Sequence, residues 1–200
     1  MVSAVRERVD EAQVGAWLRP SELGGNAAVQ ALSRLARDPE SELVRAAKGL
    51  YFKSGAPDPF FGKRKPAPVE IAKQVAGGRG VGPAGPFAAA SLGLTTQVAS
   101  RPMLTIVGTP PTGVEGVDWQ VRKNNPARAQ LNFTEIAILE LLSLFPYGTE
   151  AAWGDVVDRV GELRSRKKVD LYRIQKAVAA ERRKPVLRRN FERLLADLAA

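Results

Sequence analysis

The sequence contains no cysteine and no histidine among its 200 residues. Without cysteine there is no disulfide and no thiolate nucleophile, and without histidine there is no imidazole base. The usual zinc ligands are missing as well. Any enzyme chemistry would therefore depend on carboxylates, hydroxyls, lysine or arginine. The lack of cysteine is compatible with a reducing cytosol.

Long apolar segments are also missing. No uninterrupted apolar run approaches the roughly 18 residues that a membrane-spanning helix needs. Where a signal peptide would carry its apolar region, the chain has Arg6, Glu7 and Arg8. These absences predict a soluble cytoplasmic protein with no membrane partner.

Positive charge is abundant instead. The chain has 30 Lys and Arg against 21 Asp and Glu, a net charge of +9 and a pI near 10.2. This balance favours a polyanionic partner, nucleic acid first and an acidic protein surface second. Residues 1–60 carry as many acidic as basic side chains. This segment can therefore bind DNA only if its basic residues are gathered on one face.

The first part of the chain has helical patterns. Apolar residues at helical spacing predict a first helix over about the first dozen residues. A proline can then start a short second helix, which ends at Gly24-Gly25. Asn26 is a candidate N-cap for a third helix that runs to Arg37, because an Asp-Pro pair follows.

The third helix is predicted to have two faces. Its packing face consists of Ala28, Val29, Leu32, Leu35 and Ala36. Its polar face consists of Asn26, Gln30, Ser33, Arg34 and Arg37.

Two short strand patterns follow, at residues 43–46 and 50–53. They are joined at Ala47-Lys48-Gly49, where the glycine can supply a positive backbone angle. These elements follow the order of a winged helix-turn-helix, which is a helix, a short helix, a turn, a third helix and a hairpin. In that fold the third helix enters the DNA major groove and the hairpin follows the backbone. We therefore predict that residues 1–60 form a winged helix-turn-helix domain that binds double-stranded DNA.

The polar face has the chemistry for reading bases, since arginine pairs with guanine and glutamine with adenine. The alternative is an ordinary solvated helix face. Cations in the hairpin can follow phosphates or, alternatively, discourage edge-to-edge aggregation. The predicted DNA-binding residues are Arg19, Asn26, Gln30, Ser33, Arg34, Arg37, Arg45, Lys48 and Lys53.

Prolines at 57, 59, 66 and 68 interrupt the chain after the hairpin. Residues 61–67 are therefore predicted to be a linker, and residues 68–200 a second domain. The expected elements of the second domain are helices at 69–75 and 86–92, a glycine-rich loop at 77–85, strands at 103–107 and 117–121, and helices from 134 onward. The fold class is thus α+β and helix-dominated, with a C-terminal domain that is mixed α/β and then helical.

Two basic clusters are candidates for further phosphate or partner contacts. The first cluster is Lys63, Arg64 and Lys65, and the second is Arg166, Lys167 and Lys168. The alternatives are a solvated linker for the first and solvated helix ends for the second.

Two segments resemble a known family. Residues 31–35 (ALSRL) and 43–51 (LVRAAKGLY) are similar to the wing region of the AbiEi antitoxins of type IV (abortive-infection) toxin-antitoxin systems. Residues 88–98 (AAASLGLTTQV) resemble the segment that follows the wing in that family. The resemblance extends to about residue 145 and is weaker beyond it.

This resemblance implies a transcriptional repressor that binds inverted repeats in the promoter of its own operon, with a homodimer on DNA as a candidate assembly. It also implies neutralisation of a nucleotidyltransferase-type toxin encoded beside it. Two alternatives stay open. One is a metal-dependent nucleic-acid-processing enzyme that uses Glu135, Glu140 or Asp155 with Asp158, and the other is a winged helix that contacts only proteins. Our prediction is a non-enzymatic protein without a cofactor or metal.

Overall fold

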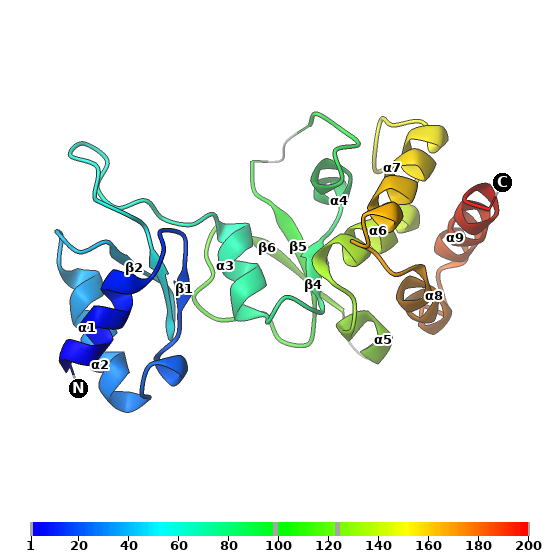
Figure 1. Cartoon of the computed structure of the whole chain (residues 1–200). Coiled ribbons are helices and arrows are strands. Elements are labelled where there is room, and N and C mark those ends of the chain that lie inside the picture. Colours follow the sequence, from blue (N-terminus) through cyan, green and yellow to red (C-terminus); the bar gives the residue numbers. More distant parts are fainter. Residues whose placement is uncertain (1, 98–99, 123–124, 200) are drawn as a thin grey trace. The chain divides into compact units, whose positions relative to one another are not determined.

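A computed structural model describes residues 2–97, 100–122 and 125–199 (Figure 1). Within these residues, nine α-helices and one short 3-10 helix accompany six short strands in two three-stranded sheets. The predicted α+β class with dominant helices is confirmed. The chain forms two compact units, the first from Met1–Ile71 with Thr112–Glu115 and the second from Ala72–Pro111 with Gly116–Ala200.

The first unit contains three helices and one sheet. Its elements are α1 (Val2–Glu11), β1 (Trp17–Leu18), the 3-10 helix η1 (Pro20–Glu22), α2 (Asn26–Arg37), β2 (Leu43–Ala47) and β3 (Leu50–Lys53). The predicted bounds of α2 are confirmed, as is the hairpin of β2 and β3. Its turn contains Gly49 at φ +70°, a conformation that L side chains rarely adopt. The two-residue strand β1 was not predicted, and it pairs antiparallel with β3 to give the order β1-β3-β2.

The core of the first unit lies between α1, α2 and the sheet. Val5 and Val9 from α1 meet the buried Leu32 of α2, and Leu43 and Tyr51 close the core from the hairpin. Residues 4, 6–8, 10 and 11 of α1 are exposed, so this helix buries one narrow stripe, as the periodicity predicts.

The second unit begins within α3 and contains the other sheet. Its elements are α3 (Pro68–Val75), β4 (Val81–Pro83), α4 (Pro86–Ser91), β5 (Met103–Val107), β6 (Asp118–Arg122), α5 (Pro126–Ala129), α6 (Phe133–Leu144), α7 (Trp153–Ser165), α8 (Leu171–Ala180) and α9 (Pro185–Asp197). Strand β5 is central, antiparallel to β4 and parallel to β6. Strand β4 lies where the sequence predicted only a glycine-rich loop.

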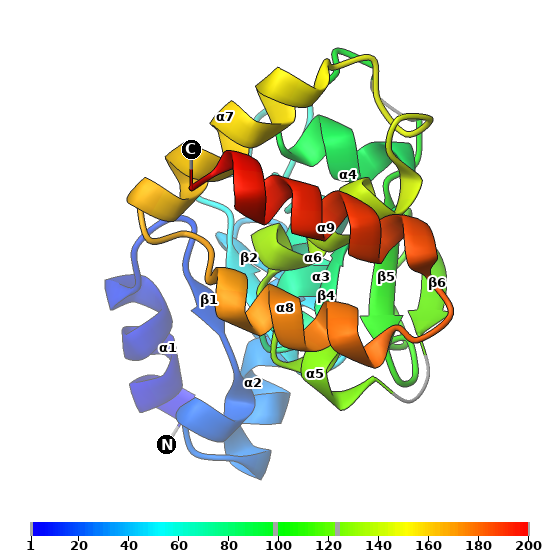
Figure 2. The same ribbon diagram turned by 90° about the vertical axis from the view of Figure 1, so that its right-hand side faces the viewer.

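Helix α6 is the centre of the second unit. It packs against α4, α8, α9 and β4, and eight of its twelve residues are buried. Figure 2 shows α9 and α8 lying over α6 on the side turned toward the viewer. A reciprocal capping box fixes its first turn: Asn132 accepts from the Glu135 N–H at 2.9 Å, and Glu135 accepts from the Asn132 N–H at 2.8 Å.

Among the described residues, none of the helices combines the length and apolar character required to cross a membrane. The longest helices, α7 and α9, have 13 residues each.

Candidate nucleic-acid interface

Helix α2 presents a polar face to solvent. Asn26, Gln30, Arg34 and Arg37 are exposed, and Ser33 is half-buried. They recur at helical spacing and therefore share one side of the helix. The opposite side is fixed by Ala28, Ala31 and Leu32, which are all buried. The polar residues are consequently held on a helix whose rotation is set by its packing.

One apolar residue belongs to the exposed side. Val29 was predicted on the packing face, but 44% of its surface is accessible. The buried stripe of α2 is narrow and centres on Ala28 and Leu32, so Val29 falls at its border. The sequence pattern missed Val29 as a surface residue because a hydrophobic side chain at helical spacing is normally assigned to the core.

The ends of α2 depend on backbone geometry. Gly25, at φ +66°, is the N-cap, and no side chain caps the first turn. The prediction that Asn26 caps the helix is therefore wrong: Asn26 is the first helical residue, and its side chain is exposed. At the other end, the Asp38 N–H donates to the carbonyls of Arg34 and Leu35, each at 3.2 Å.

The hairpin adds two exposed cations, Arg45 on β2 and Lys48 in the turn. Arg19, just before η1, is half-buried, and its guanidinium lies 3.8 Å from the Glu22 carboxylate. Screening by solvent makes such a partly exposed pair weak.

Lys53 does not belong to this surface. Its side chain is buried, and its Nζ donates to the carbonyls of Val9 and Asp10, both at 2.8 Å. The Glu42 carboxylate is 3.5 Å away. The predicted phosphate contact of Lys53 is wrong, because the ammonium group binds the C-terminal carbonyls of α1 instead.

Replacing Lys53 by methionine keeps most of the side-chain volume but leaves these two carbonyls without their donor. Because hydrogen bonds to a charged group contribute more than neutral ones, we expect the unfolding free energy to fall by about 2 kcal/mol. Chemical denaturation followed by circular dichroism measures the change. The matched control is Lys48→Met, which alters an exposed lysine of the same hairpin and should shift stability by less than about 0.5 kcal/mol. Equal losses in the two variants would contradict the role given to Lys53.

The three basic residues Lys63, Arg64 and Lys65, which follow the hairpin, differ in their contacts. Lys63 Nζ donates to the carbonyls of Ala36 and Asp38 at the end of α2 and to that of Leu43 at the start of β2. Burial lowers the pKa of Lys63, and the charge of Asp38 only partly opposes this effect. Arg64 and Lys65 remain exposed. Residues 61–67, predicted to be a linker, belong to the first unit and are tied to α2 through Lys63.

The second predicted cluster lies at the end of α7 in the second unit. Arg166, Lys167 and Lys168 are all exposed. Arg166 pairs with Glu162 of the same helix at 2.8 Å, and Lys167 adopts a positive φ of 55° as the chain leaves the helix. The cluster therefore presents three cations, of which one is already paired.

Three of the four acidic residues considered for a metal-dependent enzyme make contacts within the fold, and the fourth, Asp158, is exposed on α7. Glu135 is fully buried and, besides its capping role, accepts from the Asp170 N–H and from Arg173. Glu140 is buried in an ion-pair network, and Asp155 accepts from the Ala152 N–H at the start of α7. Within the described ranges, no group of three or more acidic side chains is arranged to hold a metal ion.

Comparisons with known proteins give distant structural likeness alone. No protein-family model matches the chain, and no curated protein sequence is similar to it. Among solved structures, the crystal structure of the RV2827C protein from Mycobacterium tuberculosis aligns with a TM-score of 0.47 at 14% identity, over 98% of this chain and 76% of that one.

Proposed function

We propose that the first unit is a winged helix-turn-helix whose helix α2 reads double-stranded DNA in the major groove. The observation that carries this proposal is the solvent-exposed polar face of α2, with Gln30, Arg34 and Arg37 on one side of a helix locked by its apolar side. The order of α1, η1, α2 and the β2–β3 hairpin is the order of that motif. The hairpin takes the place of the wing.

The proposal gives defined roles to three side chains of α2 and to two of the hairpin. Arg34 donates two hydrogen bonds to a guanine edge, and Gln30 pairs with an adenine edge. The exposed Val29 contacts a thymine methyl group. Arg45 and Lys48 of the hairpin bind phosphates without reading sequence.

The biological role we propose is repression by occupancy. On this view the protein is cytoplasmic, binds inverted repeats near its own operon as a homodimer, and acts as the antitoxin of a nucleotidyltransferase-type toxin. The similarity of residues 43–51 and 88–98 to the AbiEi antitoxins supports this part of the proposal. The excess of basic residues beyond residue 60 supports additional contacts with DNA or with an acidic partner surface.

The test is binding of the purified full-length protein to duplexes from the region upstream of its own gene, measured by fluorescence anisotropy. In the variant Gln30→Ala with Arg34→Ala, we expect affinity for the specific duplex to fall about 100-fold, while affinity for a scrambled duplex changes little. Loss of two base-reading side chains removes discrimination and leaves phosphate binding in place.

Two control variants define what this result means. Arg45→Ala with Lys48→Ala removes phosphate contacts, so it should weaken both duplexes alike and lower the slope of log affinity against log salt by about 2. Gln130→Ala with Arg188→Ala removes the same residue types from exposed positions of the second unit and should leave discrimination unchanged. The proposal fails if the Gln30 and Arg34 variant discriminates as the wild-type protein does.

A further inference from the structure

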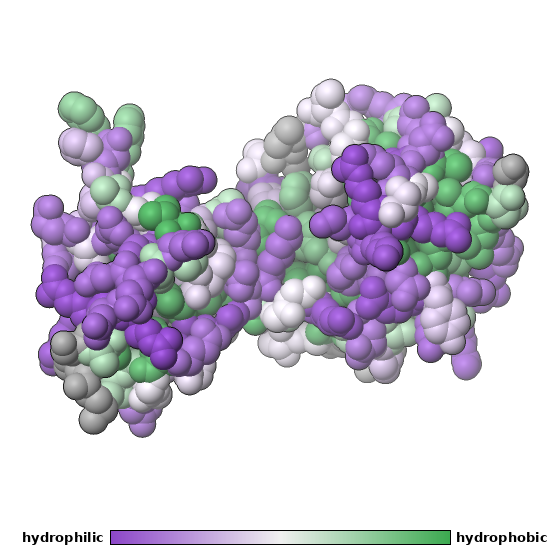
Figure 3. Space-filling view, viewed as in Figure 1, coloured by the Kyte–Doolittle hydropathy of each residue, from purple (hydrophilic) through white to green (hydrophobic). Residues whose placement is uncertain are grey.

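A short loop of the first unit carries two aromatic side chains into solvent. We call residues 57–62 the aromatic finger. At its tip, Phe60 is 91% exposed and Phe61 is 90% exposed. The space-filling view shows apolar side chains at the end of a projection from this unit (Figure 3). Two adjacent phenylalanines in water lack the favourable free energy of burial that such side chains normally gain. Their exposure on an ordered turn therefore indicates a binding surface.

The finger is held in one shape. Asp58 and Gly62 exchange two backbone hydrogen bonds of 2.9 and 2.8 Å across its base. The Asp58 carboxylate accepts from the N–H groups of Phe60 at 2.8 Å and Phe61 at 2.9 Å. The hydrogen bond from the Phe61 N–H, followed by that from Phe60, lowers the pKa of Asp58, because both bonds favour its charged form. A preorganised tip pays little conformational entropy when it binds.

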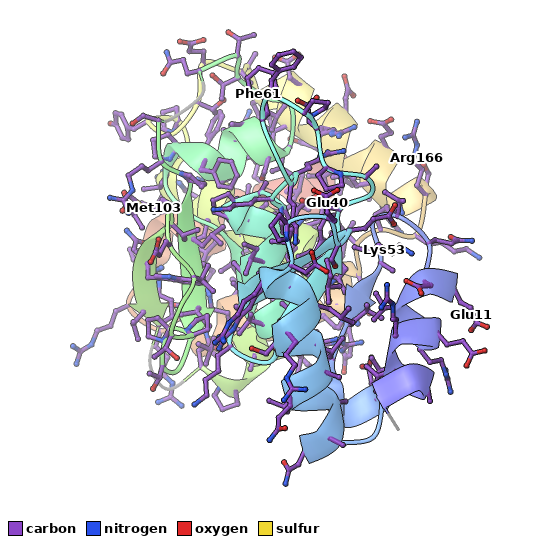
Figure 4. All side chains as sticks on the ribbon, turned by 90° about the vertical axis from the view of Figure 1, so that its left-hand side faces the viewer. Glu11, Glu40, Lys53, Phe61, Met103 and Arg166 are labelled. Atoms are coloured by element: carbon purple, nitrogen blue, oxygen red, sulfur yellow. The ribbon has the colours of Figure 1, made fainter. Side chains whose placement is uncertain are left out.

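The finger is also tied to helix α2. Lys63, the residue after it, donates to the carbonyls of Ala36, Asp38 and Leu43, which fixes the end of the finger against the C-terminus of α2. In Figure 4, Phe61 lies at the far end of a loop that rises past Glu40. The base of the finger is therefore anchored beside the C-terminal end of α2.

Charges of both signs lie around the finger, and two cations beside its base are free to meet a phosphate backbone. Arg64 and Lys65 are exposed directly after it. Of the nearby acids, Asp38 faces Lys63 and Glu42 pairs with Lys53 at 3.5 Å. These lysines offset two of the acidic charges beside the base of the finger. The Asp58 carboxylate is occupied by two backbone N–H groups, and Glu40 is exposed, so phosphate binding falls to Arg64 and Lys65.

We propose that the aromatic finger is an apolar wedge that inserts Phe60 and Phe61 into a minor-groove base step beside the site read by α2, while Arg64 and Lys65 bind the flanking phosphates. Minor-groove proteins use apolar side chains in this way to unstack a step and bend the duplex. This proposal rests on the proposed DNA-binding function and adds a second contact to it.

The experiment uses the full-length protein and the duplex that it protects in its upstream region. Donor and acceptor dyes at the two duplex ends report bending, and 2-aminopurine placed at successive flanking steps reports unstacking. For Phe60→Ala with Phe61→Ala we expect loss of both signals and about tenfold weaker binding. Tyr147→Ala is the matched control because Tyr147 is 96% exposed on the second unit, and it should behave as wild type.

A third variant tests the rigid turn. Asp58→Ala keeps both phenylalanines but removes the acceptor of two backbone N–H groups, so we expect reduced bending with the affinity between those of wild type and the double variant.

The possible results separate this proposal from the proposed function. Suppose that the Gln30 and Arg34 variant loses discrimination but the Phe60 and Phe61 variant bends and unstacks DNA as wild type does. The proposal that the finger is a wedge is then wrong, and the proposal that α2 reads DNA is kept. If the Phe60 and Phe61 variant leaves bending unchanged but alters the sedimentation of the protein, the finger binds protein, which also overturns the wedge. If the wild-type protein does not discriminate between duplexes at all, both proposals fail.

Discussion

Replacing Arg128 by methionine is expected to lower the unfolding free energy by about 3–5 kcal/mol, the largest effect of any substitution considered. Arg128 lies in α5, and its side chain is fully buried. It forms an ion pair with Glu140 of α6 and another, at 3.2 Å, with Glu181 after α8. Methionine fills the space of the arginine stem but provides no charge. Glu140, of which only 3% of the side chain is exposed, would then depend on Arg122, a partly exposed cation at 3.3 Å.

The pH dependence gives this prediction a second measurement. Burial alone would raise the pKa of Glu140, but the charges and hydrogen bonds of Arg128 and Arg122 outweigh it and lower the pKa. A pKa that is lower in the folded than in the unfolded state stabilises the fold above the ordinary glutamate value of about 4.3. This stabilisation is lost as the pH falls through the folded-state pKa. Without Arg128 the pKa of Glu140 should rise from its lowered value, because Arg122 alone then opposes the effect of burial, so the variant should lose part of this pH-dependent stabilisation.

Urea unfolding followed by circular dichroism, repeated across this pH range, measures both effects. A second variant, Arg128→Met with Glu140→Leu, removes the stranded carboxylate and should recover much of the lost stability. Arg188→Met, at an exposed position of α9, is the control for the loss of an arginine. A loss below about 1 kcal/mol in Arg128→Met, with the pH profile unchanged, would show that the network is not needed for stability.

The sequence predicted those elements whose bounds are set by residues within them or next to them. Helix α2 ends at Arg37, before Asp38-Pro39, and the β2–β3 turn contains a glycine at positive φ, both as the sequence indicated. Strand β4 has only three residues and lies among glycines, so no alternating pattern marks it. It is a strand because it pairs with β5, and that information lies more than twenty residues away in the chain.

The same limit applies to the candidate interface. The polar face of α2 follows from helical periodicity alone, and its exposed residues agree with that pattern. The burial of Lys53 could not be predicted, because the carbonyls that bind it belong to Val9 and Asp10, more than forty positions earlier. The exposure of Phe60 and Phe61 was likewise hidden, since an aromatic pair among prolines is equally compatible with a buried turn.

The second large effect is expected at Gly82, where β4 passes α6. A Cβ atom on Gly82 would lie 2.5 Å from the Ile136 Cβ and 3.0 Å from the Phe133 carbonyl oxygen. Neither atom is the flexible end of a side chain, so strand and helix would have to separate. We expect Gly82→Ala to lower the unfolding free energy by about 3 kcal/mol through overpacking.

Gly154 provides the matched control for this substitution. It lies in the first turn of α7, and a Cβ there meets no atom within 4 Å. Because alanine favours a helix over glycine, Gly154→Ala should leave stability unchanged or raise it by about 0.5–1 kcal/mol. Thermal and urea unfolding measure both variants. If Gly82→Ala lowers the unfolding free energy while Gly154→Ala does not, the loss comes from the contact between β4 and α6. If both variants were as stable as wild type, β4 would not need its close approach to Ile136, and the packing of the second unit around α6 would have to be looser than the structure indicates.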